Sequence, residues 1–393
     1  MGERTILTGN DAAALAFMHV NPDVAAVFPI TPQTELMHQF TQYVADGEVD
    51  TELIPVESEH SAMSAALASA LSGARTITAS SSAGLALMWE MLYVTASSRA
   101  PVVMVDVNRA LSAPINIHCD HSDSMGARDA GWIQIFSENT QESYDNAIQA
   151  FRIAEHSDVQ LPVMVTLDGF ILSHTMEVLE ILDRETVQKF VGEYNITTKL
   201  LDFDNPVTMG PLALTPHYFE CKRQQIEAME NARKVILDIG KEYGRISGRS
   251  YGYFEEYKLD DAEVGVMVLG STAGTAKVAV DLARDKGIKA GLLKLRVFRP
   301  FPGNEIVEAI KHLKALAVMD RSASFGLTGG PVFNEVRSAS YGAGIDTLIS
   351  SVIYGLGGRD TYPEQIADLL DKVRADADAG KVRDVQRFVG LRE

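Results

Sequence analysis

The segment IPVESEHSAMSAALASALSG, residues 54–73, contains the pattern that decides the fold of the N-terminal half of the chain. A short apolar run ends at Glu57, and an Ala-rich, almost uncharged helix is expected to follow it. In one interpretation Ser58 caps this helix, and Glu59 in its first turn suits the positive end of the helix dipole. In the other interpretation, one carboxylate is buried there in order to exchange a proton. The local sequence favours the first.

The same order of elements, an apolar run followed by a turn and a helix, recurs through residues 1–175. Two runs, PVVMVDVN at 101–108 and LPVMVTLDG at 161–169, are apolar along almost their whole length, as expected for parallel strands covered on both faces. Alternating strands and helices of these lengths predict an α/β domain built on a parallel sheet. In such sheets, ligands bind at the loops that leave the carboxyl ends of the strands.

The remaining sequence is expected to form two further parts. Residues 176–260 are irregular and interrupted by prolines, and we interpret them as an arm and linker with a long, charged, solvent-facing helix near 221–246. Residues 261–393 are predicted to form a second α/β domain. This domain begins with the strand VGVMVLGS at 264–271 and continues with AGLLKLRVFRPFP at 290–302 as another strand.

Composition excludes several classes of protein. The chain has 393 residues and a formal net charge of −18, so a broad surface of Lys and Arg for nucleic acid is not expected. No run approaches the length of a membrane span and the N-terminus has no apolar signal core, so we expect a cytoplasmic protein without membrane association. The two cysteines, Cys119 and Cys221, form no C-x-x-C motif, so no zinc or iron–sulfur site is expected on this chain.

Three motifs permit a bound phosphate or metal, but another interpretation is favoured for each. Gly270-Ser271-Thr272 lies between a strand and a helix and could cradle a phosphate, yet it lacks the spacing of a dinucleotide fingerprint or a P-loop. YGLGGRD at 354–360 contains the glycines of a tight turn. HCDHSD at 118–123 contains potential metal ligands, but neighbouring residues of an extended loop point in alternate directions. A polar loop lining a site is therefore favoured over a bound metal.

Arg109 follows the buried strand 101–108 directly, at the end of the sheet where ligands bind. Its guanidinium group suits a planar carboxylate because it can donate two parallel hydrogen bonds. Pairing with a nearby carboxylate, such as that of Asp106 or Asp120, is an equal alternative on sequence alone.

Thr31 lies at another predicted strand end, in FPITPQTEL at 28–36, where two prolines fix the backbone around its hydroxyl group. The same pattern also makes an ordinary rigid turn. Thr31, Glu59 and Arg109 thus follow three different strands. Because the carboxyl ends of parallel strands meet at one edge of a sheet, their convergence favours a ligand site for all three.

Several of these segments together resemble the alpha subunit of 2-oxoacid:ferredoxin oxidoreductases, most closely the multi-subunit pyruvate:ferredoxin oxidoreductases, or pyruvate synthases. The segments are FPITPQTE (28–35), ESEHSAMSAALASALSGART (57–76), SSSAGLALMWEML (80–92), residues 105–145 and RVFRPFP (296–302). The resemblance implies an α/β fold with a thiamine-diphosphate-binding parallel-sheet domain of the pyrimidine type, followed by a domain like the C-terminal domain of transketolase. The chain contains no GDG motif for the diphosphate, which agrees with the pyrimidine type.

The resemblance implies that Glu59 is the glutamate that binds the pyrimidine ring. A carboxyl group there hydrogen-bonds N1′ and favours the imino tautomer, which lets the cofactor lose its C2 proton. Glu57, two residues earlier, points the other way if the segment is extended, and we assign it no chemistry. Further cofactor-binding candidates are Pro29, Ile30 and Ser82.

Thr31 and Arg109 match the residues that bind the 2-oxoacid, and the resemblance implies that both contact the carboxylate or carbonyl oxygen of pyruvate. The implied reaction is the reversible, CoA-dependent oxidative decarboxylation of pyruvate to acetyl-CoA and CO₂ with reduction of ferredoxin. Thiamine diphosphate would be bound here by its pyrimidine half. Mg²⁺ and [4Fe–4S] clusters would lie on partner chains, with the diphosphate site on a beta subunit, and gamma and delta subunits would complete the complex.

Pyruvate is the expected substrate because Thr31 is small and neutral, and because ALSAPINIHCDHSD at 110–123 resembles the loop of the pyruvate-type enzymes. A branched-chain 2-oxoacid or 2-oxoglutarate enzyme is the alternative. Outside this group of enzymes, the alternatives are a non-catalytic regulatory or assembly subunit and a thiamine-dependent decarboxylase or transketolase relative.

Overall fold

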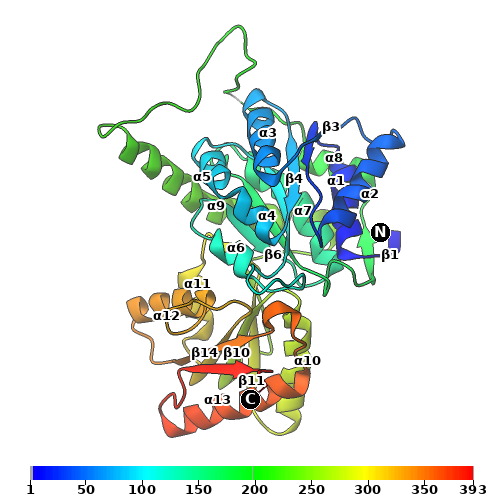
Figure 1. The fold of residues 1–393 in the computed structure, drawn as a ribbon. Helices are drawn as coiled ribbons and strands as arrows, with labels where there is room; N and C mark the ends of the chain where they lie inside the picture. Colours follow the sequence, from blue (N-terminus) through cyan, green and yellow to red (C-terminus); the bar gives the residue numbers. More distant parts are fainter. Residues whose placement is uncertain (1–2, 197, 393) are drawn as a thin grey trace.

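A seven-stranded sheet lies at the centre of the N-terminal part of the computed structural model, which describes residues 3–196 and 198–392 (Figure 1). Its strands, in spatial order, are β12 (Val297–Arg299), β6 (Ile133–Phe136), β7 (Val163–Asp168), β5 (Val103–Asn108), β4 (Thr76–Ser80), β2 (Val24–Val27) and β3 (Glu52–Pro55). The pairs from β6 to β3 are parallel, while β12 pairs antiparallel with β6 at the edge. Strands β4, β5 and β7 are buried along their whole length, which confirms the predicted parallel sheet.

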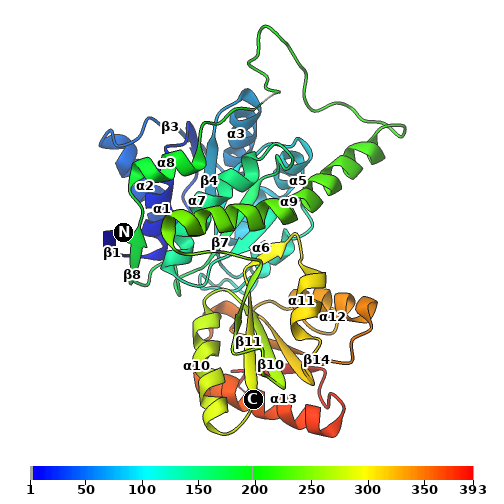
Figure 2. The ribbon, with the colours of Figure 1, turned by 180° about the vertical axis from the view of Figure 1, so that it is seen from behind.

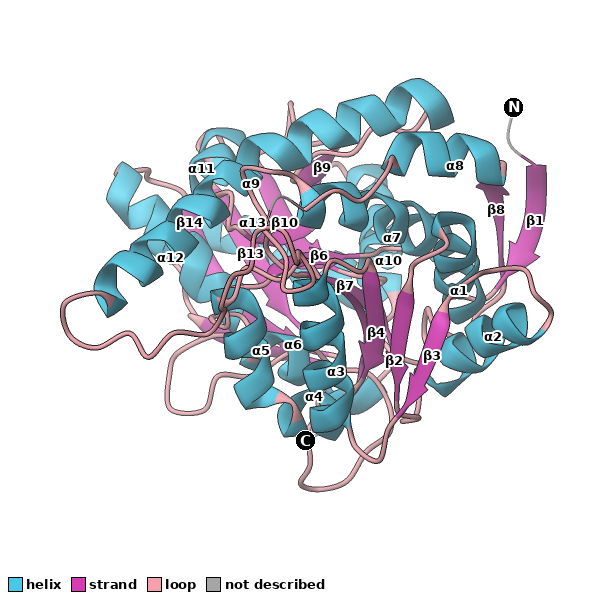
Figure 3. Cartoon of the chain, turned by 90° about the horizontal axis from the view of Figure 1, so that it is seen from above, coloured by secondary structure: helices cyan, strands magenta, loops and turns pink. Residues whose placement is uncertain are grey.

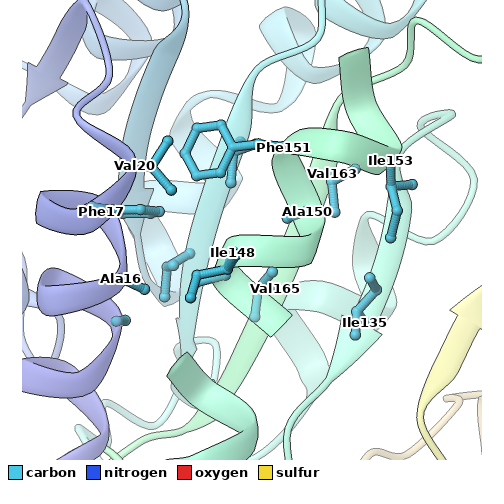
Figure 4. Packing of buried hydrophobic residues seen from close by; sticks show 14 of the residues in the cluster. Ala16, Phe17, Val20, Ile135, Ile148, Ala150, Phe151, Ile153, Val163 and Val165 are labelled. Atoms are coloured by element: carbon cyan, nitrogen blue, oxygen red, sulfur yellow. The ribbon is translucent and has the colours of Figure 1, made fainter. Parts of the chain in front are cut away.

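Helices cover both faces of this sheet (Figures 1 and 3). The first face carries α1 (Gly9–Val20), α2 (Thr34–Ala45), α7 (Thr140–Glu155), α8 (Arg184–Val191) and α9 (Tyr218–Ser247). The second face carries α3 (Glu59–Ser72), α4 (Ser82–Leu87) and α5 (Trp89–Ser97). On the first face Phe17 of α1 meets Phe151 of α7 edge-on, with 6.0 Å between the ring centroids, close to Val163 and Val165 of β7 (Figure 4).

The segment interpreted as an irregular arm and linker contains more regular structure than the sequence indicated. It includes β8 (Glu177–Ile181), which pairs antiparallel with the N-terminal β1 (Glu3–Leu7), and β9 (Phe254–Tyr257), which joins the second sheet. The expectation of a solvent-facing α9 holds for residues 218–227, but from Ala228 onward one face of the helix, including Ala232 and Ile236, is buried in the first core. Figure 2 shows α9 lying across the N-terminal part. Among the described residues, no helix is both long and apolar enough to cross a membrane.

A six-stranded sheet forms the C-terminal part. In spatial order its strands are β15 (Gln386–Val389), β14 (Leu348–Tyr354), β13 (Ala315–Asp320), β10 (Val264–Leu269), β11 (Ala290–Leu295) and β9. Its two faces are covered by the pairs α10 (Thr272–Asp285) with α13 (Pro363–Ala379), and α11 (Gly303–Ile310) with α12 (Pro331–Ala343). The predicted single strand 290–302 divides here: β11 stays in this sheet, while β12 crosses to the edge of the seven-stranded sheet.

The carboxyl ends of the two sheets meet through a buried cluster around Asp168, the last residue of β7. His121 Nε2 lies 2.8 Å from Asp168 Oδ1, and Ser271 donates to Oδ2 from its backbone nitrogen at 3.1 Å and its hydroxyl at 2.5 Å. Arg321, which follows β13, forms an ion pair with the same carboxylate at 3.4 Å. The turn at Gly270-Ser271-Thr272 therefore binds an anion, but that anion is a side chain of this chain.

We expect Asp168→Asn to reduce the free energy of unfolding by about 3–5 kcal/mol, because the substitution leaves the charge of Arg321 buried without its partner. Urea denaturation of the full chain measures the change. Asp261→Asn is the control, since Asp261, the partner of Arg284, is exposed and loss of its charge should change stability little. A loss no greater than that of the control would contradict a structural role for the cluster.

The effect of Asp168→Asn should also depend on pH. Burial alone would raise the pKa of Asp168, but His121 and Arg321 hold the pKa of this carboxyl well below its usual range. A depressed folded-state pKa stabilises the protein above the unfolded pKa, near 4, and the stabilisation is lost as pH falls through the folded value. The difference in unfolding free energy between wild type and variant should therefore be largest near pH 7 and shrink in strong acid.

Candidate active site

The loops that follow β5, β4, β2 and β3 leave adjacent strands at the carboxyl edge of the seven-stranded sheet. They carry the predicted site residues Arg109, Ser82, Thr31 and Glu59 in that order. Arg109 Nη1 donates a hydrogen bond of 3.1 Å to the carbonyl oxygen of Thr31. The structure thus brings Thr31 and Arg109 together as the sequence predicted, and places Glu59 on a neighbouring strand end.

Glu59 has the position that the first interpretation predicts, and it is also buried, as the second requires. Ser58 is the N-cap of α3, since its hydroxyl accepts from the backbone nitrogen of Ser61, and Glu59 lies in the first turn. Glu59 is also buried, with 6% of its surface exposed, and its carboxylate accepts no hydrogen bond from residues 3–196 or 198–392. Buried carboxylates are ordinarily hydrogen-bonded, so this one is available to a ligand.

Gly84 of α4 makes the space in which the Glu59 carboxylate lies. A Cβ atom on Gly84 would stand 2.6 Å from Glu59 Oε1 and 2.7 Å from the hydroxyl oxygen of Ser80. The Ser80 hydroxyl is itself buried and, within the described part of the chain, has no hydrogen-bond partner. A carboxylate and a hydroxyl group therefore lie close together at this strand end with unused capacity for hydrogen bonding.

Glu57 differs from Glu59 in every one of these respects. Its side chain is exposed and accepts a hydrogen bond from the Ser61 hydroxyl, which lowers its pKa. This position is consistent with our assigning no chemistry to Glu57, because its carboxylate is exposed to solvent and already accepts a hydrogen bond.

Arg109 is almost fully buried and is held by backbone carbonyl groups. Its Nε donates to the carbonyl oxygen of Asn116 at 3.2 Å, in addition to the bond to Thr31. It forms no ion pair with Asp106 or Asp120 or with any other described residue, so the alternative of an internal pair is wrong. Its second terminal nitrogen, Nη2, donates to no group of the described residues and remains available to an anion.

Asp123 positions two of these loops, a role that sequence reasoning missed. Its Oδ2 accepts from the backbone nitrogens of Ser82, at 3.0 Å, and of Arg109, at 2.8 Å, while Oδ1 accepts from Asn108 Nδ2 at 2.9 Å. Burial raises the pKa of Asp123 to about 6 although these donors act in the opposite direction. On sequence it was one of several potential ligands in HCDHSD, and nothing local separates it from the others.

The remaining cofactor-binding candidates occupy different environments. Ser82 is fully buried, and its hydroxyl donates to the carbonyl oxygen of Ala110 at 2.7 Å, so this hydroxyl already joins two loops. Pro29 is exposed and Ile30 is half-buried in the loop after β2. Asn10 of α1, which the sequence did not single out, holds this loop by donating to the carbonyl oxygen of Pro32 at 2.9 Å.

Comparison with known proteins now separates the functional alternatives. Residues 15–241 match the family model described as pyruvate flavodoxin/ferredoxin oxidoreductase, thiamine diphosphate-binding. The chain belongs to the pyruvate:ferredoxin oxidoreductase family. Residues 262–366 match the model of the pyruvate:ferredoxin oxidoreductase core domain II. The predicted family and the predicted thiamine-diphosphate-binding domain are thereby confirmed.

Curated relatives match over the whole chain. A pyruvate synthase subunit PorA of Thermotoga maritima is 53% identical over 392 residues, covering 100% of this chain and 99% of its own. The PorA subunit of Methanocaldococcus jannaschii is 45% identical, with 100% and 99% coverage. The ketoisovalerate oxidoreductase subunit VorA of Pyrococcus abyssi is 42% identical, with 98% and 97% coverage. The chain is thus the predicted alpha-type subunit of a pyruvate:ferredoxin oxidoreductase, and the branched-chain enzymes are near relatives.

A solved structure supports the fold of this family member. The 2-oxoglutarate:ferredoxin oxidoreductase from Magnetococcus marinus, solved with 2-oxoglutarate, coenzyme A and succinyl-CoA bound, aligns with a TM-score of 0.71 at 19% identity. The alignment covers 94% of this chain and 65% of that one. At this identity the likeness supports the arrangement of the two α/β parts and carries no residue roles.

The polar loop 118–123 of this family member serves to dock the two sheets. The carbonyl oxygen of Cys119 accepts from the backbone nitrogen of Gly358, and Asp120 accepts from that of Gly357. Cys119, His121 and Asp168 lie close enough to ligate one ion, with their donor atoms within 4.8 Å of one another. Because the guanidinium group of Arg321 already supplies a positive charge to this cluster, we assign it to docking and not to a metal.

We expect Gly84→Ala to weaken thiamine diphosphate binding by the assembled enzyme and to lower its activity roughly a hundredfold, since the added methyl group displaces the Glu59 carboxylate. The cofactor dissociation constant and the melting temperature measure the effect. Gly274→Ala in α10 is the matched control, because the new Cβ would lie 3.8 Å from its nearest neighbour. Equal cofactor binding by the two variants would contradict the assignment of this space.

Proposed function

We propose that Glu59 binds the pyrimidine half of thiamine diphosphate and that Arg109 binds the carboxylate of pyruvate. The observation that carries the first role is the buried carboxylate of Glu59, which has no hydrogen bond within the described residues and lies on a thiamine-diphosphate-binding domain. The neighbouring Ser80 hydroxyl adds a second polar group without a partner. A heteroaromatic ring with donor and acceptor nitrogens would satisfy both.

Thiamine diphosphate, when bound, supplies the electron sink into which the 2-oxoacid loses CO₂. The part of Glu59 is to hold a proton at its carboxyl oxygen against the pyrimidine N1′. Glu59 directly follows the N-cap Ser58, so the start of α3 fixes the point at which its side chain leaves the backbone. Gly84 permits close approach from α4, while Pro29 and Ile30 provide apolar contacts beside the ring.

Arg109 binds the substrate because its position is fixed and one of its terminal nitrogens is unused. The bonds to Asn116 and Thr31 remove the rotational freedom of the guanidinium group, so little entropy is lost when a carboxylate binds. Thr31 is exposed, and its hydroxyl lies on the same loop as the carbonyl oxygen that holds Arg109. We assign it to the substrate oxygen next to the one that Arg109 binds.

The full reaction requires other chains. Pyruvate and CoA become acetyl-CoA and CO₂, and the electrons released pass through iron–sulfur clusters to ferredoxin. We infer that these clusters, Mg²⁺ and the diphosphate site lie on beta, gamma and delta subunits, since this sequence has no GDG motif and its cysteines, Cys119 and Cys221, form no cluster motif. The relatives named as subunits PorA support an assembly of this kind.

Pyruvate is the proposed substrate, and a branched-chain 2-oxoacid is the alternative that the VorA relatives support. The higher identity to a PorA subunit, 53%, and the small side chain of Thr31 favour pyruvate. CoA-dependent viologen reduction by the anaerobically purified complex, with a panel of 2-oxoacids, tests the choice. Faster turnover of 2-oxoisovalerate than of pyruvate would overturn it.

We expect Glu59→Gln to leave the complex assembled and to remove most of its activity, since the amide cannot share a proton with N1′. Glu57→Gln is the control, because Glu57 is exposed and bonded to Ser61. Pyruvate-dependent viologen reduction and size-exclusion chromatography measure activity and assembly. Normal turnover by the Glu59 variant would refute the pyrimidine assignment.

We expect Arg109→Ala to raise the KM for pyruvate roughly 10- to 100-fold while thiamine diphosphate still binds, because a charge-assisted hydrogen bond worth about 1.5–3 kcal/mol is lost. Steady-state kinetics and a cofactor-binding assay separate the two effects. Arg223→Ala, which removes an exposed arginine of α9, is the control. An unchanged KM would exclude Arg109 from the substrate site.

A further inference from the structure

The segment that holds Arg109 is anchored from both parts of the chain: Asp123 and Ser82 hold its start, and the C-terminal sheet holds its other end. It leaves β5 at Arg109, closes on itself through a hydrogen bond of 3.0 Å from Ala110 N to the carbonyl oxygen of His118, and is largely exposed between these ends. Ile115 at its tip is 77% exposed. Since few side chains of this loop are packed in its own domain, the contacts at its base decide its position.

The C-terminal sheet supplies several of those contacts through the turn that follows β14, which we call the glycine turn, Gly355–Gly358. The Gly358 backbone nitrogen donates to the carbonyl oxygen of Cys119 at 2.6 Å, and that of Gly357 donates to Asp120 Oδ2 at 3.3 Å. One residue further along the loop, His121 N donates to the carbonyl oxygen of Arg321 at 2.8 Å. The base of the loop is therefore bonded to the second sheet by its backbone.

Asn116 connects the glycine turn to Arg109. Its Nδ2 donates to the carbonyl oxygen of Gly357 at 2.9 Å, and its own carbonyl oxygen accepts from Arg109 Nε at 3.2 Å. Its Oδ1 accepts from His118 N at 2.8 Å, which fixes the side chain within the loop. Two hydrogen bonds thus separate a turn of the C-terminal sheet from the guanidinium group of Arg109.

The glycine turn fits against this loop only because it has no side chains. A Cβ on Gly357 would stand 2.4 Å from Asn116 Nδ2, and a Cβ on Gly358 would stand 2.4 Å from the Cβ of His118. Both glycines have positive φ, 60° and 78°, which other residues adopt only at a cost. The glycines of YGLGGRD make a turn, as predicted, and this turn packs against Asn116 and His118 of the loop that follows β5.

We propose that the glycine turn of the C-terminal sheet positions Arg109 for the 2-oxoacid carboxylate, and that Asn116 transmits this positioning. The affinity of the site for substrate is thereby influenced from the second sheet through Asn116. Asn116 and Gly357 are positioning residues. This inference rests on the proposed role of Arg109.

The test is Gly357→Ala in the assembled enzyme, with Gly380→Ala as the matched control. Gly380 also has positive φ, 64°, and a Cβ there would meet nothing within 4 Å, so the control reproduces the backbone strain without the collision. We expect Gly357→Ala to raise the KM for pyruvate about tenfold, with kcat, thiamine diphosphate affinity and melting temperature close to those of the control. An unchanged KM would overturn the proposal, as would a loss of kcat and cofactor affinity with the same KM.

Asn116→Ala provides a second, independent variant in case Gly357→Ala does not assemble. It removes the bond to Gly357 while keeping the backbone carbonyl group that accepts from Arg109. A raised KM is expected here too, and the double variant should raise it no further than either substitution alone, because both act along one path. Fully additive effects would refute that path. If Arg109→Ala leaves the KM unchanged, the proposed role of Arg109 is wrong. If Arg109→Ala raises the KM but Gly357→Ala does not, only the proposed connection through Asn116 is wrong.

Discussion

The buried carboxylate of Asp168 is the interaction on which the arrangement of the site depends. It lies at the end of β7, and its partners come from a loop of its own domain, His121, and from two strand ends of the other sheet, Ser271 and Arg321. The carboxyl ends of the strands of the two sheets are therefore joined to each other. The loops between them are held from both sides, which reduces their freedom before any ligand arrives.

The buried polar groups of this region fall into two kinds. Some already have hydrogen-bond partners in the protein and support the loops, whereas others have none among the described residues and are candidates to bind a ligand. Asp123 and Asp168 are buried carboxylates with several donors each, so their hydrogen-bonding capacity is used by the protein. Glu59 is also buried, with 6% of its surface exposed, but receives no donor within residues 3–196 and 198–392, and the fully buried Ser80 hydroxyl beside it has no partner there either. Since leaving such groups unpaired costs stability, the contrast supports the proposal that a ligand's polar atoms bind at Glu59 and Ser80.

The parts of this structure that depend on local pattern could be predicted, and those that depend on distant pairing could not. Apolar strands such as 101–108 and the capped helix after Ser58 follow from neighbouring residues alone. Strand β8 was missed because its partner is the N-terminal β1, and a single predicted strand divided because its second half pairs with β6.

The same distinction applies to the candidate site. The meeting of Thr31 and Arg109 could be predicted from the topology of parallel strands. The roles of Gly84, Asp123 and Asn116 could not, since each depends on which atoms lie across a gap from it in space. The family resemblance rests on short motifs. Only the structure shows which residues of these motifs are hydrogen-bonded within the described part of the chain and which are free to bind a ligand.

Strand β12 has a consequence for how this protein can be divided. It is encoded in the C-terminal part of the chain, yet it forms the edge of the N-terminal sheet by pairing with β6. A truncated chain that ended before it would expose the backbone donors and acceptors of β6, a fully buried strand, and exposed edges of that kind recruit other chains. The two halves are therefore not interchangeable modules. A gene split or a domain exchange in this family should preserve β12 together with the N-terminal half, or supply a substitute strand, to avoid aggregation.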